Sequence, residues 1–282
     1  MKKIANLFIF IILAVLALLI CFPVLFAVTG GFSAQWELEK NLAAILGNAD
    51  GLADWSILPK APTLEPLIHL LMDSPQYFVM FWNSLKISLL ILVGQLVFGM
   101  PAAWSLARFV FPGKRIISAI YLVLMLMPFQ VLMLPEYLVL NDMGILDTHA
   151  AVIAPAVFST FPVFIMQRFF RNVPEAILEA ARIDGAGNFQ IFLRIGIPLG
   201  APGIVCSAIL GFLESWNMIE QPMTFIKTKS LWPLSLFLPE ISLSDAGLGF
   251  AAALMMLIPA LLLFLSGQEY LEQGIAAAAV KE

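Results

Sequence analysis

Residues 171 to 198 form a polar segment between two long apolar runs, and they read RNVPEAILEAARIDGAGNFQIFLRIGIP. Pro174 suits the first turn of a helix, and Glu175 complements the positive N-terminal end of the helix dipole. Glu175 and Glu179 share one helical face, on which Glu179 is placed to pair with Arg182. The pattern therefore predicts a first surface helix that starts near Pro174.

A break and a second helix follow. Asp184 and Gly185 end the first helix, since glycine adopts the left-handed conformation at little cost. An apolar helical stripe then resumes, and Pro198 marks the entry into the next apolar run; the stripe consists of Phe189, Phe192, Leu193 and Ile197. The hairpin is too polar to cross a bilayer, so we expect it at the cytoplasmic surface. Small side chains would let another molecule approach it closely, namely those of Ala180, Ala181 and Ala186.

The composition is that of a membrane protein. Of the 282 residues, 61% are hydrophobic and 12% are charged, and the mean hydropathy is +0.95. Soluble domains are about half apolar and a quarter charged. The net charge of −4 gives no basic excess, so we expect no nucleic-acid partner. With two cysteines in apolar runs and two histidines far apart, we also expect no disulfide framework, metal site or cofactor.

Six apolar stretches are long enough to span a membrane, because a helix of about 20 residues crosses roughly 30 Å of hydrocarbon. We predict an all-α polytopic protein with spans near 4–28, 85–107, 116–140, 150–170, 199–219 and 248–266. The first is interpreted as an uncleaved anchor, because its apolar core is too long for a signal peptide. Several prolines lie inside these spans and predict kinks: Pro101, Pro128, Pro135, Pro155, Pro162 and Pro259.

Orientation follows from the distribution of lysine and arginine. An N-terminus inside the cell places ten basic residues in the cytoplasm: Lys2, Lys3, Arg108, Lys114, Arg115, Arg168, Arg171, Arg182, Arg194 and Lys281. The other side keeps four lysines and an acidic loop that contains Glu37, Glu39, Asp50, Asp54, Glu65 and Asp73. Both termini are therefore predicted to be cytoplasmic. The segments are a first helix (1–28), an extracytoplasmic loop with short interfacial helices or a cap (29–76), a five-helix core (77–270) and a tail (271–282).

The polar hairpin resembles the "EAA loop" of ABC importer permeases. The matching residues are Glu179-Ala180-Ala181, Asp184-Gly185-Ala186 and Ile195-Gly196-Ile197-Pro198, at the family's spacing. Other motifs resemble the carbohydrate-uptake branch: Pro62–Glu65, Asn83–Leu85, Phe111–Lys114, Gly144–Thr148 and Trp216-Asn217. The tail Gly274–Lys281 resembles that of the maltose-type "G" permease subunit, with alanines where glycine is usual.

This resemblance implies a type I ABC importer permease in a bacterial inner membrane. The implied partners are a homologous permease subunit, two ATP-binding subunits, an extracytoplasmic solute-binding protein and membrane lipid. The solute would be a sugar, a polyol or a sugar phosphate. The hairpin would couple the permease to the ATPase through Glu179, Ala180, Ala181, Asp184, Gly185, Ala186, Ile195 and Pro198. The chain lacks a G-x-x-x-x-G-K-[ST] loop, so ATP hydrolysis is expected in a partner and no enzymatic activity in this chain.

Two acidic residues lie inside predicted spans, where a charge at the bilayer centre costs at least about 2.5–3.5 kcal/mol. We predict that Glu136 and Glu214 line the solute pathway together with Asn217, or else join helices. Alternatives stay open at this point: a proton-coupled secondary transporter that uses these carboxylates, an importer of a non-sugar solute, or a membrane enzyme or assembly factor. Only an ABC importer gives the hairpin a function.

Overall fold

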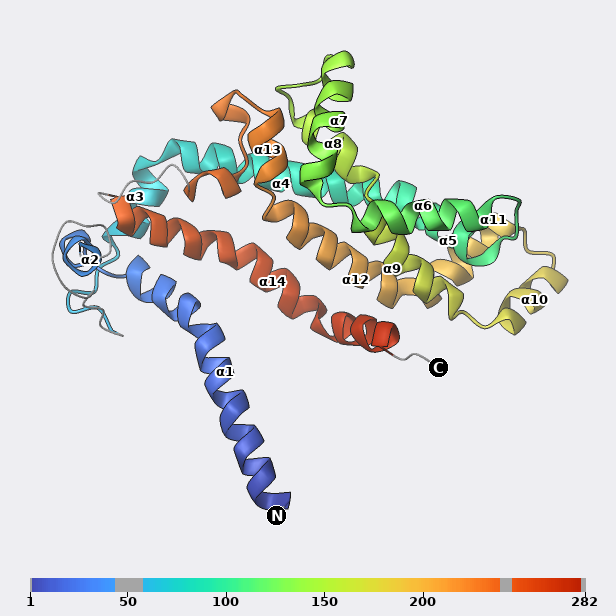
Figure 1. Ribbon diagram of the computed structural model, residues 1–282, viewed down its shortest axis with the longest axis horizontal. Helices are drawn as coiled ribbons and strands as arrows, with labels where there is room; N and C mark the ends of the chain where they lie inside the picture. The colour runs from blue at the N-terminus through green and yellow to red at the C-terminus, as the bar shows by residue number, and fades with distance from the viewer. Residues whose placement is uncertain (1, 44–57, 239–244, 280–282) are drawn as a thin grey trace. The chain divides into compact units, whose positions relative to one another are not determined.

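The computed structural model describes residues 2–43, 58–238 and 245–279, with side chains from residue 6 to residue 272 (Figure 1). Over these ranges the chain is helical, and β pairing is limited to one isolated bridge between Ser33 and Pro62. The predicted all-α class is confirmed. The predictions for Asp50, Asp54 and Lys281 concern residues outside the described ranges.

The chain divides into two compact units. Unit 1 comprises Met1–Val79 and Phe237–Pro259, and unit 2 comprises Met80–Leu236 and Ala260–Glu282. Helices α4 (Pro75–Gly94) and α14 (Ala246–Ala279) contribute residues to both units.

Unit 1 contains α1 (Lys2–Gly31), α2 (Gln35–Leu42) and α3 (Glu65–Asp73), besides the first parts of α4 and α14. The short helices expected between residues 29 and 76 are thus present as α2 and α3. Glu37 is buried, and its carboxylate accepts hydrogen bonds from the amides of Lys60 at 2.9 Å and Ala61 at 3.2 Å. A buried carboxylate must be paired or hydrogen-bonded, and these amides meet that need.

Unit 2 contains the remaining elements. They are η1 (Gln95–Gly99), α5 (Met100–Arg108), α6 (Lys114–Leu126), α7 (Phe129–Asp142), α8 (His149–Val157), α9 (Thr160–Arg171), α10 (Glu175–Ile183), α11 (Asn188–Ile191), η2 (Phe192–Gly196), α12 (Ile197–Trp216), α13 (Glu220–Phe225), η3 (Lys229–Leu231) and η4 (Leu234–Leu236). Figure 1 shows α10 and α11 at one end of this unit and α7, α8 and α13 at the other.

Five of the described helical stretches are long and apolar enough to cross a membrane. They are Asn6–Gly31, Pro75–Arg108, His149–Arg171, Asn188–Trp216 and Ala246–Glu272, and each contains most of one predicted span. The third predicted span along the chain, 116–140, is not one continuous helix, and its break falls at Pro128, one of the predicted kinks. Helices α6 and α7 meet there at 106°, so six spans result only if this bent pair crosses as one.

Prolines lie at the bend between α6 and α7 and also inside two helical stretches that continue past them. A proline disfavours helical geometry in the residue before it. Met127, which precedes Pro128, accordingly has an extended conformation with φ −76° and ψ 125°. Pro101 and Pro198 instead follow the π-helical turns η1 and η2. Each proline removes one backbone N–H donor, and the wider turn accommodates the loss without ending the helix.

Glycines of η2 and α12 allow close helix packing in unit 2. A Cβ atom on Gly200 would lie 2.4 Å from the ring of Phe170 in α9, and one on Gly196 would lie 2.7 Å from the ring of Trp104 in α5. The rings of Trp104 and Phe170 meet edge to face with centroids 5.3 Å apart. Small residues at this spacing are typical of helix interfaces in membranes.

Candidate functional site

The hairpin predicted from the sequence is formed by α10 and α11. Leu178 of α10 is completely buried in a core cluster with Phe170 of α9, Val173 and Ile191 of α11. Burying a leucine side chain contributes about 1.5–3 kcal/mol. The packing of this one side chain therefore fixes which face of α10 turns toward the rest of unit 2.

An ion-pair network attaches α10 to the end of α5. Glu175 accepts from Arg108 at 3.1 Å and from Arg182 at 2.9 Å, and the Arg108 guanidinium also donates to the carbonyl of Val173. The prediction that Arg182 pairs with Glu179 is therefore wrong. Glu175 lies two turns before Arg182, and its position beside Arg108 makes it the shared acceptor.

The C-terminus of α10 ends at a left-handed glycine, as predicted. Gly185 has a φ of +83°. The Ala186 amide donates to the Ala181 carbonyl at 2.9 Å, and the Gly185 amide donates to the Arg182 carbonyl at 3.1 Å. These two bonds define a Schellman motif, which satisfies carbonyls that the helix end would otherwise leave free.

The predicted coupling residues separate into two groups. One group is exposed and consists of Glu179, Ala180, Asp184, Gly185 and Pro198. The other is half-buried against the core cluster of unit 2 and consists of Ala181, Ala186 and Ile195. Ala181 and Ala186 therefore contact their own chain. Two large apolar side chains near the first group are strongly exposed, since Ile183 is 86% and Phe189 is 71% accessible.

A second feature of unit 2 is a cavity of about 420 Å³ at the far end of α12 from this hairpin. Its lining comes from the start of η1, the junctions of α6 with α7 and of α8 with α9, the end of α12 and the helix α13. Pockets of about 300–1,000 Å³ are typical of small-molecule sites.

Two of the breaks between helices of unit 2, both inside predicted spans, lie in the wall of this cavity. Met127 and Phe129 flank the bend between α6 and α7, while Phe158 and Ser159 separate α8 from α9. Within a membrane, backbone outside a helix is tolerated where it is buried in protein or lines a cavity. The position of the breaks thus agrees with a polar cavity inside the apolar spans.

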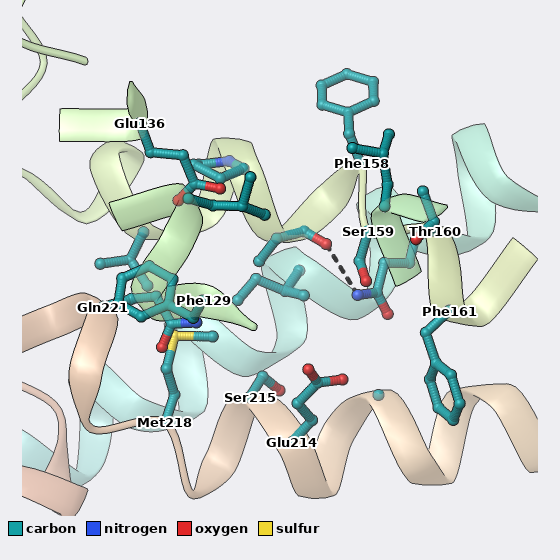
Figure 2. Close-up of a pocket in the computed structure, with 18 of the residues that line it drawn as sticks. Phe129, Glu136, Phe158, Ser159, Thr160, Phe161, Glu214, Ser215, Met218 and Gln221 are labelled. Carbon is teal, nitrogen blue, oxygen red and sulfur yellow. Dashed lines mark hydrogen bonds between the residues drawn. The ribbon is translucent and has the colours of Figure 1, made fainter. Parts of the chain in front are cut away.

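Glu136 of α7 and Glu214 of α12 both line this cavity, and Figure 2 shows their carboxylates turned toward the space between them. Within the described residues, neither carboxylate has a hydrogen-bond or ion-pair partner. Asn217 is not in the lining, because its side-chain amide donates to the Leu213 carbonyl at 2.8 Å and caps α12. The structure thus brings together two of the three predicted pathway residues.

The lining also contains Gln95, Ser159 and Thr160, and the sequence analysis missed the last two. Gln95 is only 5% accessible, and its amide nitrogen donates to the Ala156 carbonyl at 2.9 Å, the dashed bond of Figure 2. The signal for the other two was a Ser-Thr pair between Pro155 and Pro162 in an apolar run. Polar residues between two prolines indicate a broken helix.

A clamp outside the spans supports α13, which contributes to the cavity. Asp147 adopts a left-handed φ of 59°, and its amide donates to the Phe225 carbonyl at 2.9 Å. Its carboxylate accepts from the Thr228 hydroxyl at 2.6 Å and from the amides of Thr228 and Lys227 at 2.7 and 2.8 Å. The hydrogen bonds from Thr228, followed by the amide hydrogen bond and the charge of Lys227, hold the pKa of Asp147 below its usual value.

Among the described residues, no group of three or more His, Cys, Asp and Glu side chains is placed to hold a metal ion.

Comparisons with known proteins agree on one family. Residues 95–277 match the family model described as "Binding-protein-dependent transport system inner membrane component". The chain is 28% identical to the arabinooligosaccharides transport system permease protein AraQ of Halalkalibacterium halodurans, over 95% of this chain and 94% of the relative. It is 31% identical to the trehalose transport system permease protein SugB of Mycobacterium tuberculosis, over 71% of this chain and 75% of the relative.

A solved structure shows the same fold. It is a chain of a bacterial ABC transporter involved in the import of the acidic polysaccharide alginate. The two chains superimpose with a TM-score of 0.81 at 21% identity, over 95% of this chain and 97% of the other. At this identity the likeness concerns the fold.

Proposed function

Because the chain belongs to the family of binding-protein-dependent transport system inner membrane components, we propose how this sugar-importer permease is assembled and driven. It forms a translocation pathway with a homologous permease subunit. Two separate ATP-binding subunits supply the energy, and an extracytoplasmic binding protein delivers the solute. The α10–α11 hairpin is the contact with an ATP-binding subunit, and the cavity between Glu136 and Glu214 is part of the pathway.

The observation that carries this proposal is the exposed apolar surface of the hairpin. Ile183 and Phe189 are the most exposed large apolar side chains of the hairpin, and Ile183 lies one helical turn after Ala180. Exposed apolar residues that gather on an otherwise polar surface indicate a protein contact. The opposite face of α10 is occupied by its own chain through Leu178. One face is thus anchored and the other is free to meet a second subunit.

The geometry of α12 supports coupling between the hairpin and the cavity. Helix α12 follows α11 and η2 directly, and its 20 residues would extend over roughly 30 Å. Its N-terminal half packs on α9 through Gly200 and Gly203, and its C-terminal half carries Glu214 and Ser215 into the cavity. A movement imposed on the hairpin by ATP-driven closure would therefore reach the pathway through one continuous helix.

Orientation is part of the same proposal. The hairpin lies in the cytoplasm, together with the excess of basic residues and both chain termini. The segment between α1 and α4 then faces the outside, where the binding protein approaches. Family membership favours this importer over the proton-coupled alternative, because only the importer uses the hairpin.

Co-purification tests the docking surface directly. Ala180→Glu and Ile183→Glu each place a charge on the exposed face, and a tagged permease that carries either change should lose its ATP-binding subunits and its uptake of sugar. Met143→Glu is the matched control, because Met143 is a similarly exposed apolar residue at the end of α7. Retention of the ATP-binding subunits by both hairpin variants would exclude this surface as the contact.

A labelling experiment tests the orientation. A cysteine introduced at Ile183 should react with a membrane-impermeant thiol reagent only after the cytoplasmic side is opened. A cysteine at Leu64 or at Trp55 should react from outside; Trp55 lies outside the described residues. Labelling of both loops from the same side would contradict the proposed topology.

A further inference from the structure

The polar groups of the cavity share a chemical bias. Its ionisable lining residues are the two carboxylates Glu136 and Glu214, and none of its lining residues, all in the described part of the chain, is Lys, Arg or His. The remaining polar groups are the Gln95 and Gln221 amides and three hydroxyls, from Ser159, Thr160 and Ser215. A carboxylate accepts hydrogen bonds and donates none when ionised. The site therefore offers mainly acceptors and requires donors from its ligand.

Gln95 adds a third acceptor whose direction is fixed. Its amide nitrogen donates a hydrogen bond to the Ala156 carbonyl. Its amide oxygen Oε1 is buried and accepts no hydrogen bond from the protein. Leaving such a buried acceptor unpaired is unfavourable. Gly211 makes room for it, because a Cβ at that position would lie 2.6 Å from Oε1.

The walls of the cavity are aromatic and apolar. Figure 2 shows Phe129, Phe158 and Phe161 at the cavity, and Phe225 completes this set. Apolar walls with a few convergent polar groups are typical of sites that orient a small molecule. A sugar ring presents both an apolar C–H face and a rim of hydroxyl donors, so it matches both parts of the lining.

From these observations we propose that the cavity of this subunit is itself a solute-binding subsite, selective for neutral or amino sugars and against anionic ones. The inference rests on the proposed function and narrows its substrate class, because it excludes sugar phosphates and uronate-containing saccharides. A ligand phosphate or carboxylate would bring a further acidic group beside two glutamates, in a cavity whose lining contains no Lys, Arg or His to pair with it. Unpaired or like-charged groups reject a wrong ligand more strongly than a missing apolar contact does. The solute class thus differs from the acidic polysaccharide of the structurally similar transporter.

An uptake experiment without a preselected solute tests the charge preference. Cells with and without this subunit receive a hydrolysate that contains neutral, amino and uronate-bearing oligosaccharides, and mass spectrometry follows their depletion from the medium. We expect subunit-dependent depletion of neutral or amino sugars alone. Depletion of uronate-bearing saccharides at a similar rate would overturn the selectivity but leave the proposed importer intact. If no saccharide were depleted, sugar import itself would be contradicted.

Variants of the cavity then test whether the permease itself, and not only the binding protein, binds the solute. Glu136→Gln and Glu214→Gln each remove one charged acceptor, and each should lower uptake of the depleted sugar by about 10- to 100-fold. Glu269→Gln, an exposed glutamate of α14 outside the cavity, is the matched control. Co-purification of all subunits verifies assembly. Full uptake by both cavity variants would overturn the subsite.

Discussion

Gly185 gives a sharp test of the coupling hairpin, because a second glycine lies two residues away in a different backbone conformation. The φ of Gly185 is +83°, and a Cβ there would meet no atom within 4 Å. Gly187 has an ordinary φ of −71° and equally open surroundings. The substitutions Gly185→Ser and Gly187→Ser therefore add the same atoms without a clash, and only the first is strained.

The expected magnitude follows from the backbone alone. A side chain in the left-handed region costs about 1–2 kcal/mol, which reduces the population of the native turn by about 5- to 30-fold relative to alternatives. If the turn relaxes, the two hydrogen bonds of the Schellman motif are lost as well. At Gly187, serine is a favoured N-cap residue for α11, so that change should be neutral.

Two measurements distinguish these variants. Gly185→Ser should accelerate amide hydrogen exchange at Ala186 and lower both ATPase retention and sugar uptake, while Gly187→Ser should behave as the unmodified chain. Gly185→Asn should be intermediate, because asparagine tolerates the left-handed region better than other residues with a side chain. Equal uptake and equal exchange in the two serine variants would refute the argument that this turn positions α10 for coupling.

Three further predictions follow from the contacts of unit 2. Arg108→Met should loosen α10, because it removes one of the two partners of Glu175 and the donor to the Val173 carbonyl. The lost contacts contribute about 1–2 kcal/mol of local stability, so proteolysis of the hairpin should increase, and unchanged proteolysis would contradict the tie. Gly211→Ala should displace Gln95 by steric overlap and reduce sugar uptake without loss of assembly, whereas normal uptake would show that Gln95 has room to move. The hydrogen bonds that lower the pKa of Asp147 are made by its ionised carboxylate. Their contribution to stability is therefore complete above about pH 4, the ordinary carboxyl pKa, and is lost as the pH falls through the lowered pKa. Hydrogen exchange at Lys227 and Thr228, corrected for intrinsic rates, should therefore show increased opening at low pH, and Asp147→Asn should show no such dependence on pH.

Local chemistry made several features predictable from the sequence. The apolar runs identify the spans because a lipid-facing helix must hide its backbone within one segment and expose apolar side chains. The end of α10 at Gly185 is also local, since a left-handed residue depends on its own backbone and the preceding turn. The family resemblance of residues 179–198 belongs to the same group, because it depends on residue types at fixed spacing.

The ion pair of Arg182 shows where such local reasoning fails. Glu179 and Glu175 are both within reach along the helix, and the spacing alone favours Glu179. The outcome depends on Arg108, which lies 67 positions before Glu175 in the sequence and reaches it only after α5 and α10 have packed. Long-range packing thus selects between two partners that the sequence makes nearly equivalent.

The sequence by itself determined that the chain is a helical membrane permease with a surface hairpin, and that Glu136 and Glu214 are unusual for apolar spans. Only the tertiary structure decided that these two carboxylates meet in one cavity with Gln95, while Asn217 caps its own helix. The physical reason is the 106° bend after Met127, together with the break at Ser159. Pro128 signals that a bend is possible, but its angle depends on how α6 and α7 pack against α9 and α13, and those contacts exist only in the folded chain.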